Sequence, residues 1–234
     1  MHATATLQPV PQTRSIPGCA TRQQATPDAL DLLEQFGTTV AVQREHEIHG
    51  QGDKAEYCWR ILSGCVRTVK LMEDGRRQVA EFLFAGDLLG LDDLGTHDFA
   101  AEAVSDVTLR RYPRRMVEAL ADSHAILARR LRAMAMANLR NAHDRMVMLG
   151  RKTAVERVAS FVLEMNARVA APGHRLIEIP MSRTDVADHL GLTVETVCRI
   201  LAHLKREGAV KLHRTGIEVT DPAALRAFAC DVRH

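Results

Sequence analysis

The residues best suited to chemistry are Glu195 and Arg199, four apart in the stretch SRTDVADHLGLTVETVCRIL, residues 182–201. Arginine can donate two hydrogen bonds to the O6 and N7 atoms of guanine, and glutamate can accept one from the N4 amino group of cytosine. Side chains four apart on a helix are also neighbours, so these two can pair with each other. The pattern fits either base recognition or an ion pair on an ordinary surface helix.

The surrounding residues predict two short helices joined by a tight turn, over residues 183–202. Ser182 and Asp185 form a capping-box pattern at the start of the first helix. Gly191 falls where that helix must end, because glycine takes the left-handed conformation at least cost. Thr193 can cap the second helix. Apolar contacts between the helices are expected from Val186, Leu190, Leu192, Val197 and Ile200. This is the pattern of a helix-turn-helix.

The second helix of such a motif enters the DNA major groove with its N-terminal residues facing the base edges. The residues expected to contact bases are Val194, Glu195, Cys198 and Arg199. The stretch GAVKLHRTGIEVTD, residues 208–221, predicts a β-hairpin wing beside this helix. Its Lys211, His213 and Arg214 would reach phosphates.

The front of the chain predicts antiparallel β structure. Short β-branched or aromatic runs broken by Gly and Asp extend over residues 38–112. Asp74-Gly75 lies between two such runs, as in a hairpin turn that needs positive φ. This spacing favours a sandwich or barrel over alternating strands and helices.

A long helix is expected next, because no Gly or Pro occurs from Ser123 to Leu149. One apolar stripe consists of Leu127, Leu131 and Met134. A heptad-like seam on a neighbouring face consists of Ala135, Leu139, Ala142, Met146 and Leu149. One stripe can pack on the β domain while the other meets a second copy of the chain. The alternative is that both stripes belong to the core of a single chain. A further helix is expected over residues 153–169, before a break at Pro172-Gly173.

Charge is divided unevenly along the chain. Residues 28–109 hold 7 Lys and Arg against 16 Asp and Glu, whereas residues 110–234 hold 22 against 13. The basic back half favours a polyanionic partner, the alternative being arginines on solvated helix faces.

No apolar stretch is long enough to span a membrane, so no membrane partner is expected. The five cysteines are odd in number and lack a C-x-x-C pair, which favours a reducing cytoplasm.

Three stretches resemble the CRP/FNR superfamily of bacterial transcription regulators. LGLTVETVCRIL resembles its recognition helix, whose reading pattern is E-x-x-[SG]-R. ILSGCVRTVKLMEDGRRQVAEFLFAGDLLG resembles its β-roll, and LGRKTAVERVASFVLEM is similar to the segment after its dimerisation helix. The resemblance covers nearly the whole chain after the first 27 residues.

The resemblance implies an α+β fold. It predicts an N-terminal antiparallel β-roll (a jelly roll like those that bind cyclic nucleotides), a long dimerisation helix and a C-terminal winged helix-turn-helix. The expected organisation is a disordered tail at 1–27, a β-roll sensor-like domain at 28–122, the dimerisation helix at 123–150, and the DNA-binding domain at 151–234.

The resemblance also implies a homodimer that binds an inverted repeat and recruits RNA polymerase. Glu195 and Arg199 match the family's base-reading pair. Valine at 194, where cyclic-AMP receptors have an arginine, makes the chain similar to the FNR/FixK branch. That branch reads TTG-type half-sites in an inverted repeat, usually TTGAT-N4-ATCAA. The positions matching DNA backbone contacts are Ser182, Arg183, Thr193, Thr196 and His213.

No cofactor is expected. The stretch GDLLGLDDLGTHDFAAEA, residues 86–103, holds no arginine, although a buried phosphate needs a cation or a helix N-terminus. An iron–sulfur cluster needs about four ligands, and Cys19 stands alone in the tail. His46 and His49 face opposite sides of a strand, so neither haem nor zinc is expected, and no catalytic set indicates an enzyme.

The chain is therefore interpreted as an effector-independent activator. The alternatives are the same scaffold gated by an unidentified small ligand in the β-roll, or a repressor.

Cys198 replaces the serine that is usual on the reading helix of the FixK-like branch. Thiols near a helix N-terminus ionise and oxidise more readily. Oxidation of Cys198 would block DNA binding by bulk and charge, which makes this residue a redox candidate. The alternative is a small side chain that touches a thymine methyl group.

Overall fold

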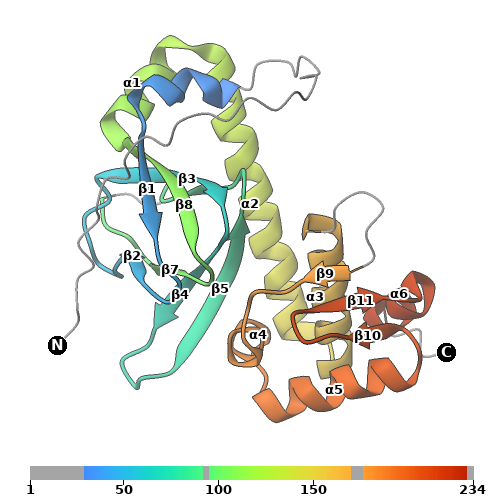
Figure 1. The fold of residues 1–234 in the computed structure, drawn as a ribbon. Coiled ribbons are helices and arrows are strands. Elements are labelled where there is room, and N and C mark those ends of the chain that lie inside the picture. The colour runs from blue at the N-terminus through green and yellow to red at the C-terminus, as the bar shows by residue number, and fades with distance from the viewer. Residues whose placement is uncertain (1–28, 92–94, 170–175, 231–234) are drawn as a thin grey trace, which may run out of the picture. The chain divides into compact units, whose positions relative to one another are not determined.

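The structure is a computed structural model that describes residues 29–91, 95–169 and 176–230 (Figure 1). The tail predicted over residues 1–27 and the break at Pro172-Gly173 lie outside these described residues. The described chain divides into two compact units. Residues 29–75 and 81–139 form the first, and residues 76–80 with 140–230 form the second.

Antiparallel strands dominate the front of the chain, as predicted. They follow a 3-10 helix, η1 (Ala29–Phe36), which the sequence pattern did not indicate. The strands are β1 (Thr38–Val42), β2 (Glu47–His49), β3 (Tyr57–Ser63), β4 (Cys65–Leu71), β5 (Arg77–Phe84), β6 (Leu88–Leu89), β7 (Ala100–Ala103) and β8 (Val107–Pro113). The predicted hairpin joins β4 to β5, and Gly75 in its turn has φ 83°.

The strands form two four-stranded sheets that share one core. The strand order is β1-β8-β3-β6 in one sheet and β2-β7-β4-β5 in the other. Val40 pairs with Leu109 in the first sheet, Val66 pairs with Ala103 in the second, and all four belong to one buried cluster. Alternating side chains from both sheets therefore meet face to face, as in a β-roll.

Two helices follow the sheets, α1 (Arg114–Ser123) and α2 (Ala125–Arg151). The sequence pattern did not indicate α1. The helix expected over 123–150 is α2, which continues through Gly150. Leu127 is buried in a second core cluster together with residues from η1, β3 and α1, and Leu131 and Met134 pack against this cluster. The stripe Leu127–Leu131–Met134 therefore belongs to the core of the single chain.

The second unit contains the predicted helix-turn-helix and wing. Its elements after α2 are α3 (Ala154–Val169), β9 (Leu176–Glu178), α4 (Arg183–Leu190), α5 (Val194–Arg206), β10 (Val210–Leu212), β11 (Gly216–Val219) and α6 (Pro222–Cys230). The wing hairpin β10–β11 is extended by β9, giving the sheet order β10-β11-β9. The sequence pattern did not indicate α6. Lys152 donates a hydrogen bond from Nζ to the Ala229 carbonyl near the end of α6, at 3.2 Å.

Within the described residues, none of the helices has the length and apolarity needed to cross a membrane.

Candidate DNA-binding interface

The capping box predicted at the start of α4 is formed. The backbone N–H of Asp185 donates to Ser182 Oγ at 3.0 Å, and the backbone N–H of Ser182 donates to Asp185 Oδ2 at 3.0 Å. Each residue satisfies a backbone donor that the first helical turn leaves without an intrahelical partner. The start of the helix-turn-helix is therefore stabilised by two residues three apart in the chain.

The turn between α4 and α5 is built on Gly191, as predicted. Its φ of 62° and ψ of 43° lie in the left-handed region. The N–H of Leu192 donates to the Ala187 carbonyl at 3.0 Å, the six-to-one bond of a Schellman ending. A side chain at Gly191 would be strained by this backbone conformation, which explains the glycine in the middle of the pattern.

Thr193 caps α5. Its side-chain oxygen accepts a hydrogen bond from the backbone N–H of Thr196 at 3.2 Å. Hydrogen bonds from the backbone N–H of Glu195 and from the Thr193 side chain lower the pKa of the fully exposed Glu195 carboxyl. Glu195 is therefore a carboxylate, and hence an acceptor only, at neutral pH.

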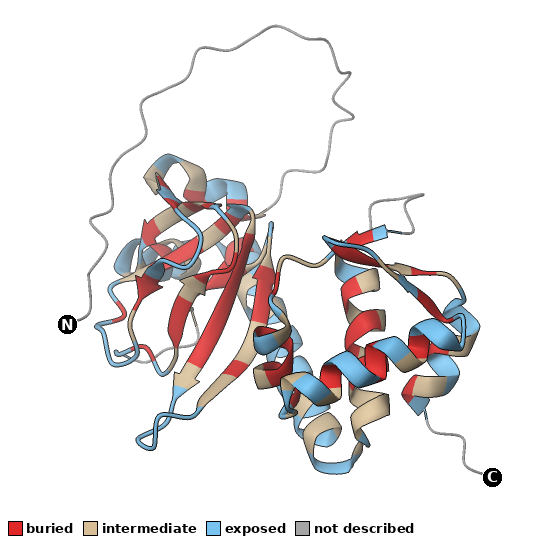
Figure 2. Ribbon diagram, turned by 60° about the horizontal axis from the view of Figure 1, so that its bottom comes forward, coloured by how far each residue is buried: buried red, intermediate tan, exposed pale blue. Residues whose placement is uncertain are grey.

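Apolar packing holds α5 against the rest of the unit. Of the five predicted contacts, Val186, Leu190, Val197 and Ile200 are buried, whereas Leu192 is half-buried. Leu201 and Leu204 continue the buried stripe of α5. Buried and exposed residues alternate along this helix in Figure 2. One face of α5 is therefore buried in the core and the other is exposed to solvent.

The four predicted base-contact residues occupy the outward face. Glu195, Cys198 and Arg199 are exposed and Val194 is half-buried, at positions that a helix brings to one side. Among the described residues, no ion pair joins Glu195 to Arg199, so the pairing that their spacing allows is not formed. Both side chains extend from a rigid helix without constraining each other.

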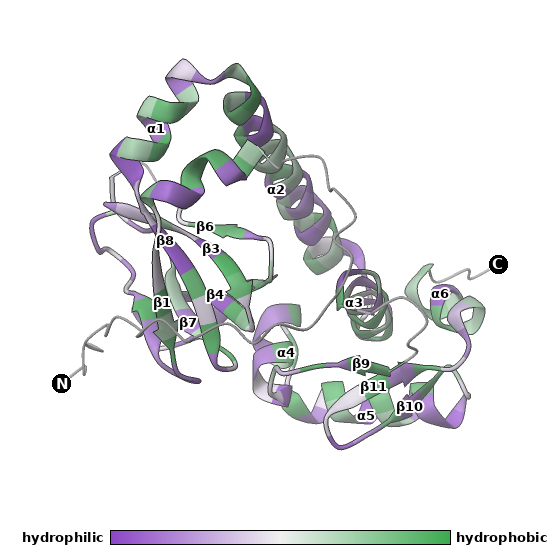
Figure 3. Cartoon of the chain, turned by 45° about the horizontal axis from the view of Figure 1, so that its top comes forward, coloured by the Kyte–Doolittle hydropathy of each residue, from purple (hydrophilic) through white to green (hydrophobic). Residues whose placement is uncertain are grey.

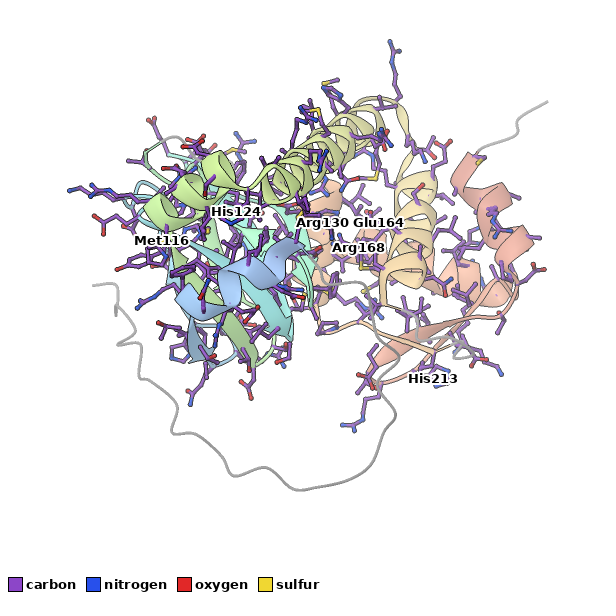
Figure 4. All side chains as sticks on the ribbon, turned by 90° about the horizontal axis from the view of Figure 1, so that it is seen from above. Met116, His124, Arg130, Glu164, Arg168 and His213 are labelled. Atoms are coloured by element: carbon purple, nitrogen blue, oxygen red, sulfur yellow. The ribbon has the colours of Figure 1, made fainter. Side chains whose placement is uncertain are left out.

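The five predicted backbone-contact residues lie at three places. Ser182 and Arg183 begin α4, Thr193 and Thr196 lie at the start of α5, and His213 is on the wing. His213 is labelled on the β10–β11 hairpin in Figure 4, and its Nε2 lies 3.0 Å from Glu218 Oε2. Two helix N-termini and a wing thus present polar groups, a suitable arrangement for phosphates.

The predicted seam on α2 is exposed in the single chain. Leu139 is 49% exposed and Met146 is 67% exposed. Ala135 and Ala142 are also exposed, whereas Leu149 is half-buried. Apolar and polar residues are interspersed along α2 in Figure 3. The seam therefore leaves two large apolar side chains in water in the single chain.

Comparison with known proteins identifies the family. Residues 156–228 match the Crp-like helix-turn-helix domain, and residues 39–124 match the cyclic nucleotide-binding domain. The chain is 36% identical over 218 residues to the nitrogen fixation regulation protein FixK of Bradyrhizobium diazoefficiens, covering 90% of this chain and 92% of that protein. The chain belongs to the CRP/FNR family of transcription regulators.

Within the CRP/FNR family, the chain is similar to FixK proteins. The nitrogen fixation regulation protein FixK of Azorhizobium caulinodans is 38% identical over 231 residues, covering 96% of this chain and 92% of that protein. The structure of FixK2 from Bradyrhizobium japonicum is 40% identical with a TM-score of 0.79, covering 82% of this chain and 96% of that one. The resemblance to the CRP/FNR superfamily, the predicted fold class and the predicted DNA-binding role are confirmed. The members of this family are regulators rather than enzymes.

The β-roll of this CRP/FNR-family chain buries two histidines, a tryptophan and an arginine. His49 and His97 are buried and stacked, with ring centroids 3.6 Å apart, and His49 also stacks on Trp59 at 5.1 Å. Buried Arg67 donates to Glu45 and Glu102, each at 2.7 Å. Among the described residues, no group of three or more His, Cys, Asp or Glu is placed to hold a metal ion.

The residue patterns did not indicate Arg157, which binds three backbone carbonyls of the second unit. No residue pattern could have revealed it, because any amino acid supplies a carbonyl.

Proposed function

We propose that this chain is a cytoplasmic transcription activator that binds, as a homodimer, a TTG-type inverted repeat similar to TTGAT-N4-ATCAA and contacts RNA polymerase there. The observation that carries the proposal is the outward face of α5, where Glu195 and Arg199 are exposed on a capped helix. The same contacts serve a repressor where the operator overlaps the promoter.

In this proposal one set of residues contacts the DNA bases and another contacts the DNA backbone. Val194, Glu195, Cys198 and Arg199 contact bases, with Arg199 donating to guanine and Glu195 accepting from cytosine. The backbone contacts come from Ser182, Arg183, Thr193, Thr196 and His213. The excess of basic residues after residue 110 supports this role, because cations that neutralise phosphates supply most of the sequence-independent affinity.

The homodimer is supported by the exposed seam of α2. A two-fold dimer presents two identical reading helices, which matches a DNA site of two inverted half-sites. The seam comprises Ala135, Leu139, Ala142, Met146 and Leu149. Burying the two large side chains Leu139 and Met146 against a second copy removes apolar surface from water at about 25 cal/mol per Å².

We further propose that DNA binding needs neither a cyclic nucleotide nor an iron–sulfur cofactor. The stacked rings of His49, His97 and Trp59 fill space inside the β-roll. A phosphate in the roll would need a cation, and buried Arg67 already donates to two carboxylates. These contacts support an effector-independent regulator over one gated by a small ligand.

The decisive experiment is a fluorescence-anisotropy titration of reduced, cofactor-free protein. A labelled TTGAT-N4-ATCAA duplex is compared with a scrambled duplex at about 150 mM salt. We expect specific binding with a Kd of about 10 nM or tighter. Equal, weak binding to both duplexes would contradict the proposal and favour either a ligand-gated protein or a different half-site.

A thermal-shift screen separates the ligand-gated alternative. A ligand of the folded β-roll at about 100 times its Kd would raise the free energy of unfolding by about 2.7 kcal/mol. We expect no such rise with cyclic nucleotides. A raised Tm accompanied by tighter DNA binding would establish ligand gating instead.

We propose Cys198 as a redox-sensitive position on the reading face. Cys198 and Cys230 are the exposed thiols among the described residues. Burial raises the pKa of the Cys58 thiol to about 12, which disfavours its reactive thiolate form. Mild peroxide should abolish specific binding by the wild type and by Cys230→Ser, but not by Cys198→Ser. Loss of binding by Cys198→Ser under peroxide would refute this role.

A further inference from the structure

Arg157, near the start of α3, connects three separate segments of the second unit. Its Nε donates to the Lys152 carbonyl at 3.0 Å, Nη1 donates to the Leu190 carbonyl at 3.0 Å, and Nη2 donates to the Leu149 carbonyl at 2.7 Å. Each of its three guanidinium nitrogens therefore holds a different stretch of backbone.

The acceptors lie where backbone carbonyls lack helical partners. Leu149 is in the last turn of α2, Leu190 is the last residue of α4, and Lys152 lies between α2 and α3. The last four carbonyls of a helix have no intrahelical donor, and this end carries partial negative charge. A cation placed at the ends of α2 and α4 is favoured by both effects.

The turn of the helix-turn-helix packs against the Arg157 guanidinium. A Cβ built at Gly191 would lie 3.6 Å from Arg157 Nη1 and 3.6 Å from Leu149 Cδ2, which is ordinary van der Waals contact. The turn that leads into α5 is therefore packed directly on the end of α2. This end of α2 carries the later part of the seam, Ala142, Met146 and Leu149, and belongs to the same compact unit.

We propose that Arg157 is a positioning residue that sets the spacing of the two half-sites. This inference rests on the proposed function, a dimer on an inverted repeat. In such a dimer the seam of α2 defines the two-fold axis, and the distance of each α5 from that axis defines the spacing. Arg157 fixes that distance, because it ties the end of α2 to α4 and the turn.

Only arginine suits this position. Its guanidinium has five N–H donors in a rigid planar fork, whereas the lysine ammonium is a compact point charge on a flexible stem. Lysine at 157 would keep the charge, but its three N–H donors all leave one nitrogen, so it could not reach the three carbonyls that Arg157 binds through three separate nitrogens. Arg157→Lys should therefore weaken the connection between the ends of α2 and α4 without changing the net charge of the protein.

The test measures affinity as a function of spacer length. Wild type and Arg157→Lys are titrated with otherwise identical duplexes whose spacers have three, four, five or six base pairs. Arg168→Lys is the matched control, because Arg168 lies on the same helix and forms an ion pair with Glu164 at 3.7 Å (Figure 4). Circular dichroism and light scattering verify that each variant is folded and dimeric.

We expect wild type and Arg168→Lys to prefer one spacer strongly. In Arg157→Lys the ratio of affinities for that spacer and for one a base pair longer should fall about tenfold, the size expected from one lost charged hydrogen bond. If Arg157→Lys is unfolded at the working temperature, Arg157→Gln is measured below its own Tm with the same duplexes. A variant that binds more weakly to every duplex but keeps the wild-type spacer ratio would overturn the inference, because a merely structural role predicts that result. Absence of any spacer preference in wild type would instead overturn the proposed function, and this inference with it.

Discussion

Two helices of the molecule expose opposite kinds of surface. On α5 the apolar residues Val197 and Leu204 are fully buried by the chain itself, and the outward face carries Glu195 and Arg199. On α2 the outward seam carries Leu139 and Met146, about half and two thirds exposed. The first helix is complete as folded, whereas the second leaves apolar surface in water.

The difference shows which function each helix can serve. A polar face on a well-packed helix costs little in water and can bind a polar partner such as DNA. Exposed apolar side chains such as Leu139 and Met146 gain free energy by meeting another apolar surface. Under the proposed function, the same chain therefore provides one surface for nucleic acid and another for a second copy of itself.

The largest expected effect comes from charging the apolar seam. Leu139→Glu should split the proposed dimer, because two buried carboxylates would face each other across the two-fold axis. Loss of the second half-site should weaken binding to the inverted repeat by about 100-fold or more. Light scattering and anisotropy measure the two effects.

Ala137→Glu is the matched control for the seam. It adds the same charge to an exposed position of α2, on the side away from the seam. We expect Ala137→Glu to remain dimeric and to bind DNA normally. A dimeric, fully active Leu139→Glu would show that the seam is placed on the wrong face.

The next largest effect concerns the polar face of α5. Arg199→Ala should cost about 1–3 kcal/mol at the matching G·C pair and relax the preference at that position. The measurement is anisotropy with a set of duplexes substituted one base pair at a time. If Arg199→Ala lost the same affinity for every duplex, Arg199 would contact phosphate rather than a base.

The sequence was informative where structure depends on neighbours in the chain. Ser182, Asp185, Gly191 and Thr193 form capping and turn hydrogen bonds with residues at most four positions away, so their types and spacing were enough to predict the turn. The stripe from Leu127 to Met134 was also predictable as a stripe, since helical periodicity is local.

The features that the sequence did not predict depend on contacts between distant segments of the chain. Arg157 binds carbonyls, which carry no residue identity, and Leu190 is 33 residues away. Glu195 and Arg199 have the spacing of an ion pair, yet Glu195 is held by hydrogen bonds at the helix start instead. Leu149 fits the seam pattern, but its side chain also packs at the turn beside Gly191.

A smaller effect distinguishes two glycines, one in the turn that precedes α5 and one within α2. Gly191→Ala should lower the free energy of unfolding by about 1–2 kcal/mol, because its φ is left-handed. Gly150 lies within α2 and has no atom within 4 Å of a built Cβ. Gly150→Ala should therefore stabilise the protein by about 0.5–1 kcal/mol. Thermal unfolding of both variants gives opposite signs if the turn conformation is correct.

The smallest effect separates the two kinds of DNA contact within the polar surface. Arg183, half-buried at the start of α4, is proposed to contact phosphate. Arg183→Ala should weaken specific and scrambled duplexes by a similar factor. It should also reduce the slope of log K against log salt by about 1, because one fewer phosphate is neutralised. Arg199→Ala should change discrimination between duplexes instead, since a base contact carries sequence information and a phosphate contact does not. If Arg183→Ala changed discrimination and left the salt slope intact, the two residues would have to exchange roles, and α4 rather than α5 would face the bases.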